Sequence, residues 1–317
     1  MNILVTGGAG FIGSHVIEQL LANGHTAVCI DNFDDFYDPN VKRRNLETVL
    51  QREGFRLVEG DIRDQSALEQ CFSGKPVDVV IHLAARAGVR PSLLQPELYY
   101  DVNVMGTLRL LEMMHKHDVS RLLFASSSSV YGNNRKIPFS ETDSVDNPIS
   151  PYAASKKAGE LLCHTYHHLY GFDIHCMRFF TVYGPRQRPE MAIHEFVKKI
   201  TREEPIVLYG DGTSLRDYTY ISDILDGIMK SVDNLEGYEI FNLGESRTIA
   251  LSELVATIEN VVVKKAIIQR QPMQPGDVQV TFADITKAKR ILGYQPCCSV
   301  ESGLEKFIEW FQKTNHI

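Results

Sequence analysis

The sequence predicts an α/β protein: a doubly wound parallel sheet, followed by a smaller C-terminal domain of mixed α/β structure. Up to about residue 180, short apolar runs alternate with amphipathic stretches, which is typical of strands alternating with helices. The apolar runs are continuous and rich in β-branched residues, which indicates strands buried on both faces. After about residue 183 this rhythm loosens, and turn signals such as Gly184-Pro185 separate the remaining segments.

Six runs are expected to form the strands of the sheet. They cover residues 2–7, 26–31, 55–61, 77–85, 121–128 and 172–180. Helices are expected at 14–23, which ends at Gly24, and near 190–202, 222–233, 251–263 and 300–313. The pattern predicts two domains, 1–183 and 184–317, with some exchange of chain between them.

Composition excludes several classes of protein. The 317 residues are 44% hydrophobic and 23% charged, an ordinary globular balance, and the net charge of −7 argues against a nucleic-acid surface. No run approaches the roughly 20 apolar residues of a membrane span, and the N-terminus lacks the features of a signal peptide. The six cysteines form no CxxC pair, so we expect reduced thiols and no metal site. A cytoplasmic location is expected.

The segment TGGAGFIG (Thr6 to Gly13) lies between a predicted strand and a predicted helix. Its first glycine, Gly7, permits a tight turn, Gly10 lets the backbone approach a pyrophosphate, and Gly13 lets the helix pack close to the strand. The helix N-terminus then offers N–H groups and a positive dipole end to phosphates. This context predicts a Rossmann-type dinucleotide site.

Acidic residues after the second and third strands complete this predicted site. Asp31, with Asn32 beside it, ends the second strand, where its carboxylate can accept hydrogen bonds from ribose hydroxyls and repel a 2′-phosphate. NAD is therefore favoured over NADP. Asp61 and Ile62 follow the third strand and are placed to meet the adenine. The basic run 42–44 is interpreted as the surface of a helix.

The segment Tyr152-Ala-Ala-Ser-Lys156 places a phenol and an ammonium four residues apart, on one face of a helix. An ammonium stabilises a nearby phenolate, so the pair can remove a proton from a hydroxyl. Ser127, Ser128 and Ser129 follow the fifth strand, where loops line the ligand crevice of such sheets. These serines and the Tyr–Lys pair are the predicted catalytic residues.

Six segments together resemble the extended short-chain dehydrogenases that act on nucleotide-sugars. They are TGGAGFIGS, HLAA (82–85), NVMGT (103–107), SSSSVYG, YAASK and RDYTYISD (216–223). The resemblance implies that Tyr152 takes the proton of the sugar C4 hydroxyl, Ser127 shares that hydrogen bond, and Lys156 holds the nicotinamide ribose. It also implies tightly held NAD, which is recycled in each turnover. The further cofactor contacts that it implies are Phe11, Ile12, Leu83, Ala84, Ala85, Asn103 and Phe179.

Three further segments resemble UDP-glucuronate 4-epimerases: residues 31–46, AGVRPSL (87–93) with RFFTVYGP (178–185), and 274–288. Related 4,6-dehydratases carry acids in the serine stretch and related UDP-glucuronate decarboxylases carry a glutamate there, whereas this chain has neither. The resemblance implies that Thr181, Ser128 and Ser129 hold the sugar carboxylate, with the charge of Arg186 nearby. The family pattern after Gly-Pro is often Trp-Gly-Arg, so the different sequence here leaves the part of Arg186 open.

Arginines are the natural partners of the diphosphate, since guanidinium forks match phosphate geometry. Arg216 and Arg90 are the candidates, although either could instead form a surface ion pair. Gln274 and Asp277 are expected to meet the uridine ribose or close a lid.

Alternative functions are a UDP-glucose or UDP-N-acetylglucosamine 4-epimerase, a UDP-glucuronate decarboxylase, or an NAD-binding regulator without turnover. A homodimer is expected through helices near 100–117 and 152–170.

Overall fold

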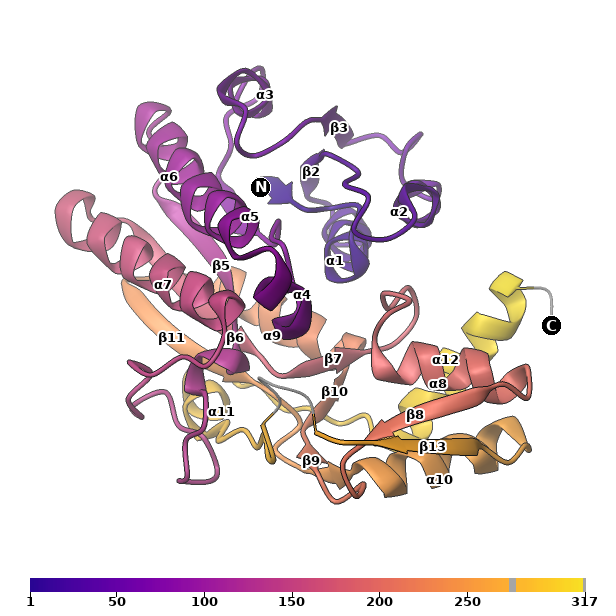
Figure 1. Cartoon of the computed structure of the whole chain (residues 1–317). Coiled ribbons are helices and arrows are strands. Elements are labelled where there is room, and N and C mark those ends of the chain that lie inside the picture. Colours follow the sequence, from indigo (N-terminus) through magenta and orange to yellow (C-terminus); the bar gives the residue numbers. More distant parts are fainter. Residues whose placement is uncertain (274–277, 316–317) are drawn as a thin grey trace. The chain divides into compact units, whose positions relative to one another are not determined.

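The computed structural model describes residues 1–273 and 278–315. The chain divides into two compact units (Figure 1). The first comprises residues 1–133, 144–178 and 227–241, and the second comprises residues 134–143, 179–226 and the chain from 242 onward. Residues 134–143 and 179–183, predicted in the first domain, thus belong to the second unit, and residues 227–241, predicted in the second domain, belong to the first unit. The division into two domains at residue 183 stays a prediction.

The first unit is built on a sheet that has seven strands among the described residues, in the order β11-β6-β5-β4-β1-β2-β3. The pairs β1–β2, β1–β4, β2–β3 and β4–β5 are parallel. Because β2 and β4 lie on opposite sides of β1, the strand order reverses at β1, and ligands of such sheets bind at this point. The strands are β1 (Asn2–Thr6), β2 (Thr26–Asp31), β3 (Phe55–Glu59), β4 (Val79–His82), β5 (Arg121–Ser127), β6 (Asp173–Phe179) and β11 (Tyr238–Leu243).

Helices cover this sheet. Leu4, Val80 and Leu122 on one face share a core cluster with Leu68 of α3 and Leu110 of α6. Alternate residues of the same strands are buried as well, so both faces are covered and the predicted fold class is confirmed. The helices are α1 (Phe11–Ala22), α2 (Pro39–Leu46), α3 (Gln65–Cys71), α4 (Val89–Leu94), α5 (Pro96–Tyr100), the π-helix η1 (Asp101–Met105), α6 (Gly106–Lys116), the 3₁₀-helix η2 (Ser128–Tyr131), α7 (Pro151–Tyr170) and α9 (Ile221–Asp233).

The second unit is mixed, as predicted. Strand β10 pairs with β7 and β13 with β8 in parallel, whereas β12 and β9 are antiparallel. The ring of Phe307, which is fully buried, lies 5.7 Å from the ring of His194, so the C-terminal helix docks on α8 through its apolar face. The elements are β7 (Thr181–Tyr183), α8 (Ala192–Thr201), β8 (Pro205–Tyr209), β9 (Leu215–Arg216), β10 (Tyr218–Tyr220), β12 (Ile249–Ala250), α10 (Leu251–Val262), β13 (Ile267–Gln271), α11 (Thr286–Leu292) and α12 (Val300–Asn315).

Each of the six strands predicted for the sheet is present, whereas β11 and η1 were not predicted. Over the described part of the chain, no helix is both long enough and apolar enough to cross a membrane.

Candidate active site

The glycine-rich turn connects β1 to α1. Gly7 has a φ of +69°, and a Cβ at this position would lie 2.7 Å from the backbone nitrogen of Ala84. A Cβ on Gly13 would lie 2.3 Å from the carbonyl oxygen of Gly7, so the helix can start this close to the turn because both residues lack side chains. Gly10 differs, since a Cβ there would meet the Gly7 carbonyl oxygen at 3.2 Å and otherwise open space.

Helix α1 begins directly after Gly10. No side chain caps its N-terminus, where Phe11 is buried and Ile12 is half-buried. Backbone N–H groups at such an end attract an anion, and the helix dipole adds to this attraction. The space over Gly10 and the uncapped helix end therefore fit the pyrophosphate of a dinucleotide.

The carboxylate of Asp31 is buried at the end of β2. It accepts hydrogen bonds from the backbone N–H groups of Ala9 (3.0 Å) and Phe33 (2.9 Å), and each oxygen keeps a further lone pair for a ribose hydroxyl. Burial raises the pKa of Asp31, although Lys42 and these N–H groups act to lower it. The surface interpretation was wrong for Lys42, because its side chain is buried and its Nζ donates to the carbonyl oxygen of Asp34 at 2.8 Å.

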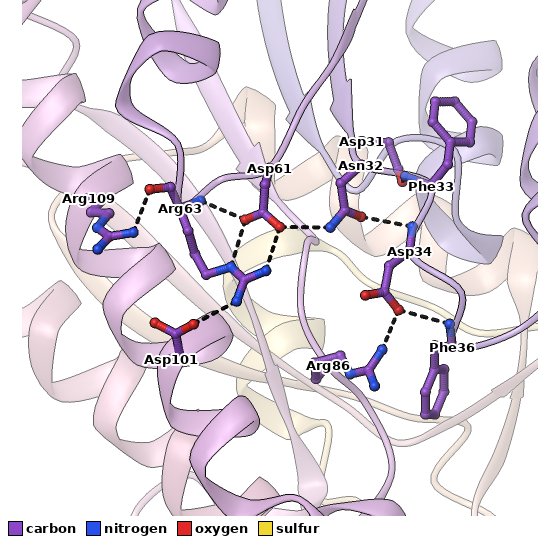
Figure 2. A network of polar contacts seen from close by, with 10 residues as sticks. All are labelled: Asp31, Asn32, Phe33, Asp34, Phe36, Asp61, Arg63, Arg86, Asp101 and Arg109. Atoms are coloured by element: carbon purple, nitrogen blue, oxygen red, sulfur yellow. Dashed lines mark hydrogen bonds and ion pairs between the residues drawn. The ribbon is translucent and has the colours of Figure 1, made fainter.

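Asp61 anchors a polar network that continues to the loop after β2 (Figure 2). The guanidinium of Arg63 donates to this carboxylate from Nε at 2.9 Å and from Nη2 at 2.8 Å. The Nδ2 of Asn32 donates to Asp61 Oδ2 at 2.8 Å. Burial acts to raise the pKa of Asp61, but these hydrogen bonds outweigh it and lower the pKa. The side chain of Ile62 lies in the core cluster, so the expected contact with adenine is left to its backbone.

The loop after β4 begins with Leu83, Ala84 and Ala85, all half-buried. The side chain of Asn103, in the π-helix, holds this loop: its Oδ1 accepts from the backbone N–H of Arg86 at 2.8 Å, and its Nδ2 donates to the carbonyl of Arg86 at 3.0 Å. Both polar atoms of the Asn103 amide are thus engaged within the protein, and a direct cofactor contact by this side chain stays a prediction.

His82 precedes this loop as the last residue of β4. Its two ring nitrogens contact the hydroxyls of Thr6 (2.6 Å) and Thr107 (3.0 Å). Burial lowers the pKa of His82 to about 3, which keeps the ring neutral. His82 is therefore a structural, hydrogen-bonding residue.

Helix α7 is held against the end of β5 at two successive turns. The Nζ of Lys156 donates to the carbonyl oxygen of Ala125 at 2.7 Å, and the hydroxyl of Ser126 donates to Glu160 at 2.6 Å. The two elements approach closely because a Cβ on Gly159 would lie only 2.3 Å from the Phe124 ring. Lys156 thereby lies next to the strand end that carries the predicted catalytic serines.

Ser127 is the last residue of β5, and Ser128 and Ser129 open η2. The hydroxyl of Ser127 donates to the hydroxyl of Ser129 at 3.1 Å and accepts from its backbone N–H at the same distance. Tyr152, half-buried, lies one turn before Lys156 on α7, with its ring edge-on to Tyr99 at 6.2 Å. Tyr152 and Lys156 thus lie on one helix that is fixed to the strand of the serines.

The remaining predicted residues are spread over both units. Arg90 is exposed on α4 of the first unit, whereas Phe179, half-buried at the end of β6, is the first residue of the 179–226 stretch of the second unit. Thr181 is the first residue of β7 in the second unit, and its backbone N–H donates to the backbone carbonyl oxygen of Asp217 at 3.1 Å. Arg186 has a φ of +67°. The side chain of Arg216 donates to the carbonyl oxygen of Gln279 at 3.2 Å. Gln274 and Asp277 lie outside the described residues.

Sequence reasoning missed two arginine pairs near this site. Arg178 of β6 forms a two-pronged pair with Glu160, with both N–O distances at 2.8 Å, and Arg86 pairs with Asp34. The signal for the first was available, because a charge inside a predicted buried strand requires a partner. Nothing in the residue pattern identified either partner.

The amino-acid sequence of the chain matches the model of a known protein family. The family model described as GDP-mannose 4,6-dehydratase matches residues 4–307. The chain belongs to this family. The resemblance to extended short-chain dehydrogenases is thereby confirmed.

Three proteins that are similar to this chain bear on its function. A UDP-glucuronate 4-epimerase of Thermodesulfobacterium geofontis is 47% identical over 97% of this chain and 95% of its own length. The structure of a UDP-glucuronic acid 4-epimerase from Bacillus cereus, in complex with UDP-glucuronic acid and NAD, is 37% identical with a TM-score of 0.92, covering 99% of this chain and all of that one. A UDP-glucose 4-epimerase from Thermotoga maritima, with UDP-glucose, is 34% identical with a TM-score of 0.92 and the same coverage.

Proposed function

We propose that the chain is an NAD-dependent UDP-sugar 4-epimerase that converts UDP-glucuronate to UDP-galacturonate. The observation that carries the proposal is the 47% identity to a UDP-glucuronate 4-epimerase over almost the whole chain. The fixed arrangement of α7 on the end of β5 supports it, because this contact brings Lys156 beside the serines. NAD, when bound, accepts a hydride from C4 of the sugar and returns it.

The chain's own residues move the proton and hold the sugar. Tyr152 takes the proton of the C4 hydroxyl while the C4–H bond of the sugar breaks. The cation of Lys156 stabilises the phenolate form of Tyr152 that accepts this proton. The hydroxyl of Ser127 donates to the developing carbonyl oxygen. The ketone turns its other face to the site, and Tyr152 returns the proton when the C–H bond forms again. Thr181, Ser128 and Ser129 hold the carboxylate, and Arg216 and Arg90 hold the diphosphate.

The serine stretch favours epimerisation over the dehydration that gives the family its description. Ser126 to Ser129 provide hydroxyls and no carboxylate, so the elimination of water lacks an acid and a base there. The second candidate function is UDP-glucose 4-epimerisation, which is favoured by the likeness to the Thermotoga maritima enzyme.

One experiment decides between these substrates. The purified protein is incubated with UDP-glucuronate, UDP-glucose and UDP-N-acetylglucosamine in turn, without added NAD, and the products are read by NMR. We expect UDP-galacturonate from the first and little turnover of the others. Faster turnover of UDP-glucose would establish the second candidate instead, and no turnover of any sugar would contradict both.

The pH dependence of turnover follows from the burial of Lys156. Burial lowers the pKa of this ammonium to about 8, although the nearby carboxylate of Glu160 acts to raise it. The group is charged below this pH and neutral above it, so kcat should fall as pH rises through about 8. Measured between pH 6 and 10, the fall should disappear in any residual activity of Lys156→Arg, whose guanidinium stays charged. A wild-type kcat that is level up to pH 10 would exclude this role.

The specificity role of Thr181 has its own test. Oxidation at C4 of a glucuronate makes a β-keto acid. This acid loses CO₂ most readily when the bond from C5 to the carboxyl carbon is perpendicular to the plane of the C4 carbonyl. A hydrogen bond to a charged group contributes about 1.5 kcal/mol or more, so Thr181→Ala should increase the share of UDP-pentose by-product about tenfold. The control is Thr257→Ala, on α10, where the hydroxyl donates to the carbonyl oxygen of Glu253 at 2.9 Å; it should leave product purity unchanged. Unchanged purity in Thr181→Ala would remove this role.

We also infer a homodimer, since apolar side chains are exposed on α5, η1 and α7. They are Tyr100, Met105, Leu161, Leu169 and Tyr170. Exposed apolar residues gathered on neighbouring helices are typical of an association surface. Sedimentation of the purified protein tests this pairing.

A further inference from the structure

Two loops of the first unit are joined by an ion pair that the proposed reaction does not use. The loop after β2 contributes Asp34, and the loop after β4 contributes Arg86, whose Nη1 donates to the Asp34 carboxylate (Figure 2). The guanidinium also lies over the ring of Phe36, 4.9 Å from its centre. The side chain of Arg86 is only 12% exposed and that of Asp34 30%, so the pair is partly shielded from water.

The position of the pair follows from the sheet order. Strands β4 and β2 lie on either side of β1, and the glycine-rich turn follows β1. Because parallel strands end at the same edge, the loops that carry Arg86 and Asp34 leave the sheet on the two sides of this turn. The ion pair thus connects the two sides of the crevice in which the dinucleotide is proposed to lie.

Both ends of the connection are fixed by other contacts. The backbone of Arg86 is held by Asn103, as described above. On the other side, the backbone N–H of Asp34 donates to Asn32 at 3.0 Å, and the Asp34 carbonyl oxygen accepts from Lys42 at 2.8 Å. With both backbones anchored, opening of the crevice at this point requires the side-chain pair to separate.

We propose that Asp34 and Arg86, with Phe36 stacked on the guanidinium, form a latch that retains NAD between turnovers. The inference rests on the proposed function, because an enzyme that returns the hydride in every turnover works without releasing its cofactor. A brace that merely stabilised the two loops would affect the melting temperature and leave the release of NAD unchanged. The rate of NAD release is therefore the quantity that separates a latch from a brace.

Asp34→Asn removes the negative charge of the latch. The carboxylate oxygen Oδ1 also accepts the backbone N–H of Phe36 at 2.8 Å, and an asparagine oxygen keeps this turn while the charge is lost. Protein loaded with labelled NAD is chased with unlabelled NAD, and the label that stays bound is followed by gel filtration. Release should be about tenfold faster than in the wild type, because a partly shielded ion pair is lost. Phe36→Leu should give a smaller acceleration in the same direction.

The matched control is Glu59→Gln, which removes the carboxylate of another arginine pair near this loop, Arg43–Glu59, and should leave release unchanged. In an Arg86→Gln background, Asp34→Asn should add nothing further. Equal release from wild type and Asp34→Asn, or an undiminished effect in the Arg86→Gln background, would overturn the latch while leaving the proposed function intact. Wild-type protein that binds no NAD would instead overturn the proposed function, and the latch with it.

Discussion

Tyr152→Phe should reduce the kcat of epimerisation by about 10²–10⁴-fold, the contribution of a positioned acid–base group. Phenylalanine keeps the ring that packs edge-on against Tyr99 and removes the hydroxyl that would take the C4 proton. Lys156 and its hydrogen bond to Ala125 are unchanged, so the variant should still contain NAD. The measurements are kcat by NMR and bound NAD by absorbance after denaturation.

The control for this prediction is Tyr170→Phe, the same chemical change at the exposed far end of the same helix. Its kcat should stay within about twofold of the wild-type value, since the change removes one hydroxyl and keeps the ring that contributes to the inferred dimer surface. A Tyr152→Phe enzyme that retained a comparable kcat with a full complement of NAD would exclude Tyr152 as the base.

The second large effect is expected on stability, from Arg178→Met. Arg178 and Glu160 are each 1% exposed, and Glu160 also accepts from Ser126 at 2.6 Å. Burial acts to raise the pKa of Glu160, yet the hydrogen bonds from Arg178 and Ser126 outweigh it and keep the carboxylate charged. Removal of the arginine takes away its two short contacts to this buried carboxylate and leaves the longer one from Lys157, at 3.5 Å, so the free energy of unfolding should fall by about 3–5 kcal/mol. Urea denaturation measures the loss.

The chain contains a matched control. Arg43 and Glu59 form the same two-pronged pair, but their side chains are 51% and 55% exposed. Arg43→Met should therefore lower the free energy of unfolding far less, because water and salt screen an exposed ion pair. The double change Arg178→Met with Glu160→Gln should recover part of the loss, because no charge is then left buried. A loss in Arg178→Met no larger than that in Arg43→Met would contradict this account.

The parts of the site that follow one another in sequence could be predicted. Gly7 and Gly13 are read from a strand–turn–helix pattern, since the turn itself requires them. Tyr152 and Lys156 are read from helical spacing, which fixes their shared face. Each of these predictions depends on local geometry, and local geometry follows from nearby residues.

Contacts between distant segments could not be predicted in the same way. Lys42 stands in a run of three basic residues, and which one turns inward depends on the rotation of α2. That rotation is set by packing, for example by Asn45, whose amide donates to the carbonyl of Ala9 at 3.0 Å. Asp34 is one of several aspartates in its loop, and its partner Arg86 is 52 residues away. Such pairs depend on the order of the strands, which residue patterns do not state.

In the proposed reaction, C4 of the sugar gives up a hydride and later receives the same hydride back. UDP-glucuronate that carries deuterium at C4 is given to the purified protein in ordinary water, without added NAD, and the product is read by NMR. We expect UDP-galacturonate with deuterium retained at C4 and a turnover slower than that of the unlabelled sugar. Loss of the deuterium from C4, or solvent hydrogen incorporated at that carbon, would contradict it.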